Sequence, residues 1–382
     1  MIRWQADMII AQTETIGGLG LDRISRRTFA GNLLASAVLI DRPGRSMQTE
    51  RKKNLRGTPS LTDVDGMLVG HFTCRERPTG CTVITSRAAF SAGVDVRGGA
   101  PGTRETDLLR AENTVEAVNA IVLAGGSAFG LDAATGVVKY LEEQGLGFET
   151  RVVKVPIVCG AILFDLSLGD PKIRPDAASG YAAAKGASSD PVGEGNIGAG
   201  AGATVGKMFG MDLAMKAGLG SWSLSRADGL KVGALVALNC AGDVVNPSSG
   251  KIIAGARNPK GGFMGTMERL RQEGRTGFPG RDNTVLGVVA TNAALGKAQC
   301  TKVAQMAQDA LARCIYPSHT PWDGDTVFAI ATGHWNSEKN PVDPGLIGAL
   351  AADVLATAIL RAAEKADSWG PYPAARDYPA KA

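Results

Sequence analysis

The sequence predicts a single α+β domain in which β-sheets are covered by α-helices. Beyond residue 60, apolar runs of strand length alternate with longer segments whose apolar residues recur at helical spacing. Glycine accounts for 50 of the 382 residues, which indicates many tight turns between elements. Neither repeats nor coiled-coil heptads interrupt this order. A layered arrangement of sheets and helices accounts for all three observations.

The predicted strands are short apolar runs bounded by turn residues. They cover residues 66–71, 81–84, 119–124, 231–239, 284–292 and 327–331. The run at 119–124 ends in Gly125-Gly126-Ser127, and helical spacing follows from Ser127 to Leu146. This order predicts a strand, a tight glycine turn and a helix.

Two further helices are predicted in the C-terminal third of the chain. Apolar residues recur at helical spacing from Lys297 to Cys314. Asp343 followed by Pro344 is typical of a helix start, and this helix is expected to run to about Ala366. The stretch from Asn258 to Arg281 is rich in Gly, Arg and Lys, which predicts a long exposed loop.

Residues 1–59 are interpreted as a leader that precedes the domain. Ser25-Arg26-Arg27-Thr28-Phe29 is similar to a twin-arginine export signal, and a modest apolar run follows it. That run is too short to span a bilayer as a helix. Two interpretations stay open: export to the periplasm, or a disordered segment with a chance Arg-Arg pair on a cytoplasmic protein. A single catalytic domain is expected over residues 60–382.

Composition and motifs exclude several function classes. The net charge of +4 is too small and too scattered for a nucleic-acid partner. The cysteines form no CxxC pair and the three histidines no HExxH motif, so neither a metal nor another cofactor is expected. The stretch before Lys207 is similar to a P-loop, but Ala201 stands where that motif requires Gly and Met208 where it requires Ser or Thr.

Thr284 is the most informative single residue. A polar, glycine-rich segment ends at Asn283, and an apolar strand begins at Thr284. If the bond between them breaks, Thr284 carries a hydroxyl nucleophile and a free α-amine, whose unperturbed pKa is about 7.7–8.0. That amine can accept the hydroxyl proton near neutral pH. The alternative is an ordinary β-branched strand residue that follows a loop.

From about Ser60 to Ala366 the chain resembles the autoprocessing family of DmpA-type aminopeptidases and NylC-type nylon-oligomer hydrolases. The resemblance rests on five stretches: residues 93–103 (GVDVRGGAPGT), 124–130 (AGGSAFG), 195–204 (GNIGAGAGAT), Asn283-Thr284 with its strand, and 319–326 (HTPWDGDT). It implies an αββα four-layer sandwich of the N-terminal-nucleophile-hydrolase type, as in ornithine acetyltransferases. It also implies self-cleavage at Asn283–Thr284 into an α chain ending at 283 and a β chain of 284–382.

The resemblance assigns roles to individual residues. Lys207 matches the family's active-site lysine, where a buried ammonium would favour the alkoxide of Thr284; the alternative is a surface lysine. Asn239 matches an asparagine whose amide can donate to the oxyanion; the alternative is a strand-end turn former. Asp323 and Asp325 would position Lys207 and Thr284, with a metal site or a type I′ turn at Asp323-Gly324 as alternatives.

A third group would bind substrate. Gly126, Ser127 and Phe129 are expected to line the substrate site, although a tyrosine is expected in place of Phe129 in the nylon-hydrolase branch. His319 is interpreted as structural, because the free amine already supplies a base.

The predicted activity is amide hydrolysis through an acyl-enzyme. Substrates would be small peptides or amides, or linear ω-amino-acid oligomers, and no membrane partner is expected. The resemblance also implies a homo-oligomer, a tetramer of processed heterodimers. Two alternatives stay open: an ornithine-type N-acetyltransferase, and a non-catalytic ligand-binding protein.

Overall fold

The computed structural model describes residues 57–273, 283–335 and 341–378. These residues fall within one compact unit, Glu50–Ala382. The Arg26-Arg27 leader and the last nine residues before Asn283 lie outside the described residues.

Nine strands form one continuous ladder that folds into two facing sheets. The order is β10-β11-β14-β16-β2-β4-β7-β3, with β1 also paired to β2. Their bounds are β1 Leu68–Thr73, β2 Gly80–Val96, β3 Thr103–Arg104, β4 Val118–Ala124, β7 Val158–Ile162, β10 Leu219–Ser225, β11 Lys231–Asn239, β14 Thr284–Thr291 and β16 Thr326–Ala331.

The long strand β2 belongs to both sheets. Its residues 81–85 pair with β1 and β4, and its residues 91–96 pair with β16. The register shifts between Thr85 and Phe90, where the strand passes from one sheet to the other. The first sheet therefore contains β1, β3, β4 and β7, and the second contains β10, β11, β14 and β16.

Three apolar clusters show that the fold has four layers. Side chains that alternate along each strand point to opposite faces: in β4, Ile121 and Leu123 face the cluster between the sheets, whereas Ala120 and Val122 face an outer helix layer. That layer consists of α2 (Ala133–Glu143) and α3 (Ala177–Lys185). Strands that are buried on both faces in this way carry near-continuous apolar runs.

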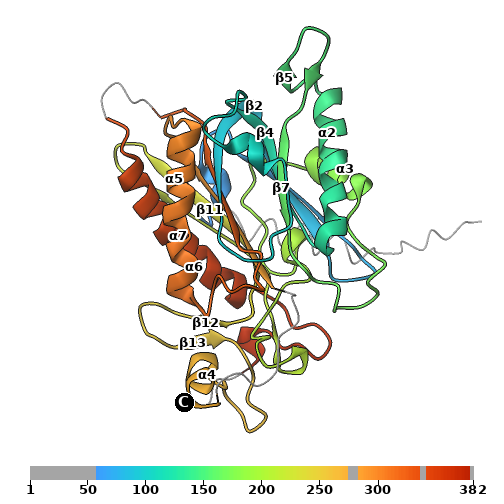
Figure 1. The fold of residues 1–382 in the computed structure, drawn as a ribbon, viewed down its shortest axis with the longest axis vertical. Coiled ribbons are helices and arrows are strands. Elements are labelled where there is room, and N and C mark those ends of the chain that lie inside the picture. The colour runs from blue at the N-terminus through green and yellow to red at the C-terminus, as the bar shows by residue number, and fades with distance from the viewer. Residues whose placement is uncertain (1–56, 274–282, 336–340, 379–382) are drawn as a thin grey trace, which may run out of the picture. The chain divides into compact units, whose positions relative to one another are not determined.

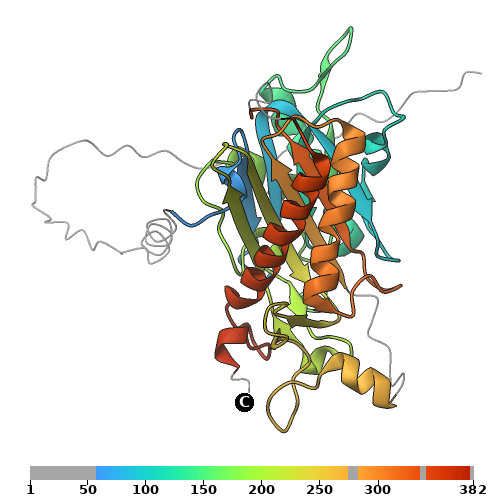
Figure 2. The same cartoon turned by 90° about the vertical axis from the view of Figure 1, so that its left-hand side faces the viewer.

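The other helix layer covers the second sheet. It consists of α5 (Lys297–Ala307), α6 (Asp309–Cys314) and α7 (Pro344–Glu364). Figure 1 shows the helix, sheet, sheet and helix layers side by side, and Figure 2 shows α5 and α7 in front of the strands that they cover. By length and composition α7 would be apolar enough to cross a membrane, but it packs on β10 and β11, and 61% of its most apolar window is buried. The layers are those of the predicted αββα sandwich.

Short elements complete the described chain. They are the strands β5 Phe148–Glu149, β6 Lys154–Val155, β8 Thr204–Val205, β9 Met215–Lys216, β12 Asp243–Val245, β13 Ile252–Ala254 and β15 Ile315–Tyr316, and the 3₁₀ turns Leu61–Asp63, Thr106–Leu109, Ser127–Asp132, Gly198–Gly200, Met211–Leu213 and Ala375–Asp377.

Most predicted elements are present, with four differences. The strand predicted at 81–84 is the 17-residue β2. The first turn of the helix predicted from Ser127 is a 3₁₀ turn, and the helix predicted over 297–314 is divided into α5 and α6. The loop predicted at 258–281 is wrong for Thr266–Glu273, which form α4. The amide of Thr266 donates to Asp243 at 2.6 Å, and this long-range cap could not be read from local composition.

Candidate functional site

Three strand ends meet at one edge of the second sheet. Asn239 is the last residue of β11 and lies directly opposite Thr284, the first residue of β14. β16 runs parallel to β14 and begins one residue after Asp325. Neighbouring parallel strands start at the same edge of a sheet, so Thr284, Asn239 and Asp325 lie close together. All three are buried.

Lys207 reaches this edge from the glycine-rich stretch. Gly206 has φ of 72°, and a Cβ there would lie 2.1 Å from backbone of a neighbouring loop, so the position requires glycine. Amides on both sides of Lys207 bond to the chain just after β11. The ammonium of Lys207 donates to Oδ1 of Asn239 at 2.8 Å and to its backbone oxygen at 3.2 Å. Lys207 is only 3% exposed, so it is not the surface lysine of the alternative interpretation.

The amide of Asn239 is fixed at both ends. Its oxygen also accepts the N–H of Thr204 at 3.0 Å, and its nitrogen donates to the carbonyl of Phe164 at 2.9 Å. Phe164 follows β7 of the first sheet, so this contact joins the two sheets at the site. Asn239 therefore directs its oxygen to Lys207 and its nitrogen to Phe164, whereas the family resemblance implies that the nitrogen donates to an oxyanion.

The bond between Asn283 and Thr284 is buried and held by the segment before β16. The carbonyl oxygen of Asn283 accepts the N–H of Gly324 at 2.9 Å and the hydroxyl of Thr284 at 2.5 Å. A Cβ on Gly324 would lie 2.6 Å from Oγ1 of Thr284, so only glycine allows this approach. The carbonyl of Asn283, the candidate nucleophile and a backbone donor thus lie in direct contact.

The motif at 93–103 supports the same segment from its other side. The amides of Arg97 and Ala100 donate to the carbonyl oxygens of Asp325 and Asp323 at 3.1 and 2.9 Å. A Cβ on Gly98 would lie 2.2 Å from the carbonyl oxygen of Asp323. This stretch therefore holds the backbone of the two aspartates in place.

The two aspartates have different partners. Asp325 accepts the amide of Val285 at 2.9 Å through Oδ1, and His319 through Oδ2. Asp323 accepts the amide of Thr320 at 2.8 Å through Oδ2, and its Oδ1 is buried with no hydrogen-bond partner among the described residues. Neither Asp323 nor Gly324 has a positive φ, which excludes the type I′ turn.

Burial and charge decide how Asp323 titrates. Burial, and then the neighbouring charge of Asp325, raise the pKa of Asp323 to about 6, although the hydrogen bond from Thr320 and the charge of Lys207 act in the opposite direction. Asp323 is therefore poised to exchange a proton near neutral pH.

The predicted substrate residues lie on the turn after β4. Gly126 and Ser127 have left-handed backbone, and their amides donate to Asp165 at 2.9 Å and to the carbonyl of Leu163 at 3.0 Å. Both acceptors flank Phe164, whose carbonyl binds Asn239. The ring of Phe129 is 58% exposed and carries the guanidinium of Arg174, 3.7 Å from its centroid. The turn is therefore anchored beside the site, with an aromatic surface open to solvent.

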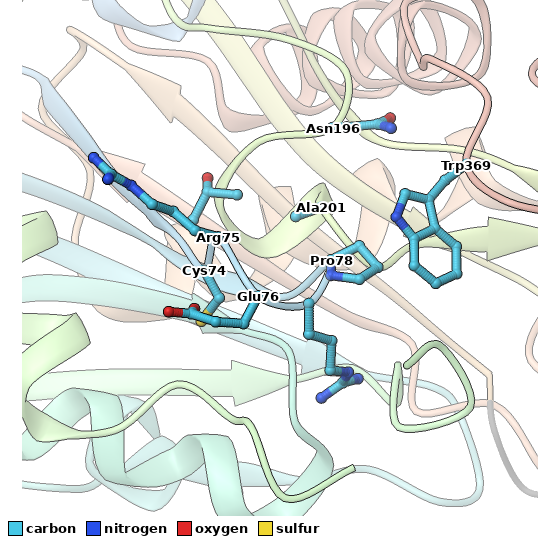
Figure 3. Close-up of a pocket in the computed structure, with 9 residues that line it drawn as sticks. Cys74, Arg75, Glu76, Pro78, Asn196, Ala201 and Trp369 are labelled. Carbon is cyan, nitrogen blue, oxygen red and sulfur yellow. The ribbon is translucent and has the colours of Figure 1, made fainter. Parts of the chain in front are cut away.

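A hollow of about 220 Å³ lies beside the turn between β1 and β2. In Figure 3, Trp369 lies beside Pro78, and Asn196 and Ala201 lie above Pro78 in the view. None of the predicted site residues lines this hollow. Within the described ranges, no group of three His, Cys, Asp or Glu side chains could hold a metal ion.

Sequence reasoning missed the contacts that hold the site together. The donor from Gly324, the amide of Thr204 and the carbonyl of Phe164 belong to the backbone, which has no residue-type signal. His319 was named but given no role at the site. Its place as the first residue of the matched stretch 319–326, six residues before Asp325, was the one available signal.

Comparisons with known proteins agree with this geometry. Residues 59–371 match the family described as Peptidase family S58. A protein of Mycobacterium tuberculosis (strain ATCC 25618 / H37Rv), described as an uncharacterized aminopeptidase, is 40% identical over 346 residues, 83% of this chain and 97% of the relative. A 6-aminohexanoate-oligomer endohydrolase of Kocuria sp. (strain KY2) is 29% identical over 375 residues, 93% of this chain and 98% of the relative.

The fold is also similar to solved structures. The L-aminopeptidase D-Ala-esterase/amidase of Ochrobactrum anthropi, described as a new variant among the Ntn hydrolase fold, matches with a TM-score of 0.59 at 21% identity. The match covers 81% of this chain and 87% of that chain. The sandwich described above is therefore of the Ntn hydrolase type.

Replacing Asp323 with asparagine is expected to stabilise the uncut protein at neutral pH. The folded-state pKa of about 6 lies above the unfolded value, so stability is highest with the proton bound, below pH about 4, and falls as pH rises through 6. Above pH 7 the variant should gain about 1–3 kcal/mol in free energy of unfolding. Urea unfolding at pH 4 and pH 8, in a Thr284→Ala background, measures this. A gain that is equal at both pH values would show that Asp323 does not titrate in this range.

Proposed function

Because the chain belongs to peptidase family S58, a family of peptide and amide hydrolases, we propose that it is a self-cleaving amidase whose nucleophile is Thr284. Cleavage of the Asn283–Thr284 bond would make Thr284 the first residue of the β chain. The observation that carries this proposal is the contact of the Asn283 carbonyl with both the Thr284 hydroxyl and the Gly324 amide.

Self-cleavage begins with attack of Oγ1 of Thr284 on the carbonyl carbon of Asn283. Negative charge develops on the Asn283 oxygen, where the N–H of Gly324 stabilises it. The C–N bond then breaks and the Thr284 nitrogen takes up a proton, which leaves an ester between Asn283 and Oγ1. Water hydrolyses the ester, releasing the Asn283 carboxylate, the Thr284 hydroxyl and a free α-amine.

The first step needs a base other than the α-amine. In the uncut chain the nitrogen of Thr284 is part of a peptide bond and cannot accept a proton. Asp323, with a pKa of about 6 and a buried Oδ1, is the carboxylate suited to this task. The ammonium of Lys207, which Asn239 holds, stabilises the negative charge that develops when the Thr284 hydroxyl attacks.

The cleaved enzyme uses the same groups, but the free α-amine of Thr284 acts as the base. Thr284 attacks a substrate amide, the N–H of Gly324 binds the oxyanion, and the α-amine passes the proton to the leaving nitrogen. Water then hydrolyses the acyl-enzyme. Asn239 acts through Lys207, because its oxygen is directed to that ammonium in the uncut chain.

The substrate class follows from the relatives and the accessible turn. Short peptides and aminoacyl amides are favoured, because the mycobacterial aminopeptidase is 40% identical and the oligomer endohydrolase 29%. Phe129 lacks the hydroxyl of the tyrosine expected in the oligomer-hydrolase branch. A transferase would pass the acyl group to an amine, so analysis of products with and without an amino-acid acceptor separates the two activities.

Thr284→Ala should abolish self-cleavage and hydrolysis together, because one hydroxyl serves both reactions. Thr284→Ser keeps a hydroxyl and should retain part of each. Intact mass spectrometry and amino-terminal sequencing check the fragments, and release of amine from aminoacyl amides checks turnover. A cleaved Thr284→Ala chain would show that another nucleophile cuts the bond.

Lys207→Met should fold but lose roughly 10²–10³-fold in both rates, since it keeps the side-chain bulk and removes one preorganised charge. The matched control is Lys172→Met, an exposed lysine on a surface turn, which should leave both rates unchanged. Thermal midpoint, fragment yield and turnover are measured on one preparation. Near-normal rates in Lys207→Met would show that Lys207 is not an active-site residue.

A further inference from the structure

His319 makes two contacts with a single oxygen of Asp325. Its backbone N–H lies 3.0 Å and its ring Nδ1 2.9 Å from Oδ2. The backbone of His319 is left-handed, with φ of 55°, which is unfavourable for most non-glycine residues. Such a conformation persists only where the surrounding contacts over-determine it. Here it brings both nitrogens to the same carboxylate oxygen.

These contacts give the two aspartates unequal environments. With the amide of Val285 on Oδ1, Asp325 accepts three N–H groups. Asp323 is hydrogen-bonded only by Thr320, and its Oδ1 has no hydrogen-bond partner in the described part of the chain. A proton taken up by the pair is therefore more stable on Asp323.

The remaining charges around the pair explain why one proton matters. Among the described residues, the titratable groups that face it are Lys207, His319 and the thiol of Cys240, whose pKa burial raises well above its usual value. At neutral pH the thiol is uncharged, so it adds no charge beside the two carboxylates. One proton on the pair reduces the repulsion between those carboxylates.

We propose that His319 is a positioning residue that fixes the carboxylate of Asp325 and leaves Asp323 as the proton acceptor of the pair. Asp325 then holds the amide of Val285, the residue after the nucleophile, and keeps Thr284 in register with Gly324. His319 itself neither touches the scissile bond nor moves a proton. This inference rests on the proposed function, because the proton on Asp323 is the one that self-cleavage exchanges.

Two substitutions separate this role from simple packing. His319→Asn keeps a donor at the position of Nδ1, the same number of bonds from Cβ, and asparagine tolerates the left-handed backbone. His319→Leu keeps much of the bulk but removes the donor. His334→Leu is the matched control, since His334 is exposed and takes no part in the site.

Self-cleavage is followed by mass spectrometry from pH 4.5 to 8.5. His319→Leu should be slower by roughly 10–100-fold, the loss expected for one charge-assisted hydrogen bond. Its acid limb should move to higher pH, because the pair, with one donor fewer, then binds its proton more tightly. His319→Asn should recover most of the rate, with the acid limb where the native protein has it, and His334→Leu should match the native protein throughout.

Equal losses in His319→Asn and His319→Leu with unmoved acid limbs would overturn the inference and leave His319 with a packing role only. If the leucine variant does not fold, His319→Gln, which displaces the donor by one bond, takes its place and should show the same upward shift. If the native protein does not cleave itself, the proposed function is contradicted instead. The native protein in this experiment shows that outcome separately.

Discussion

The site depends on one hydrogen bond, from the amide of Gly324 to the carbonyl oxygen of Asn283. This bond belongs to a parallel bridge between Asn283 and Asp323, which keeps the register of β14 and β16 three residues before their first pair, Leu286 and Thr326. The sheet that forms the core therefore also positions the Asn283–Thr284 bond. Because a Cβ on Gly324 would lie 2.6 Å from the Thr284 hydroxyl, the same glycine also makes room for the nucleophile.

Burial of the charged groups has a cost that the surrounding contacts offset. Lys207, Asp323 and Asp325 are each no more than 3% exposed, and buried ions are tolerated when paired and hydrogen-bonded. Asn239 holds the ammonium, and three N–H groups hold Asp325. Asp323 is the least satisfied member, and burial together with the charge of Asp325 raises its pKa. The least stabilised charge thus lies where a proton must be exchanged.

Local pattern was enough to predict β11, β14 and β16, because strands buried on both faces carry uninterrupted apolar runs. The loop-to-strand junction singled out Thr284, but roles for Lys207, Asn239 and the aspartates came from family resemblance. β2 is shared by the two sheets, and Asp243 caps α4. Both features depend on contacts between residues far apart in sequence. The donors from Gly324 and Thr204 belong to the backbone, so no residue type in the sequence predicts them.

The central claim is that the folded chain cuts itself, using groups that are already in contact. Its most direct test is the rate of fragment formation in refolded, protease-free protein over a hundred-fold range of concentration. An intramolecular reaction predicts one first-order rate constant at every concentration, with Thr284 as the only new amino terminus. A rate that rises in proportion to concentration, or cleavage that requires a second protein, would contradict the account.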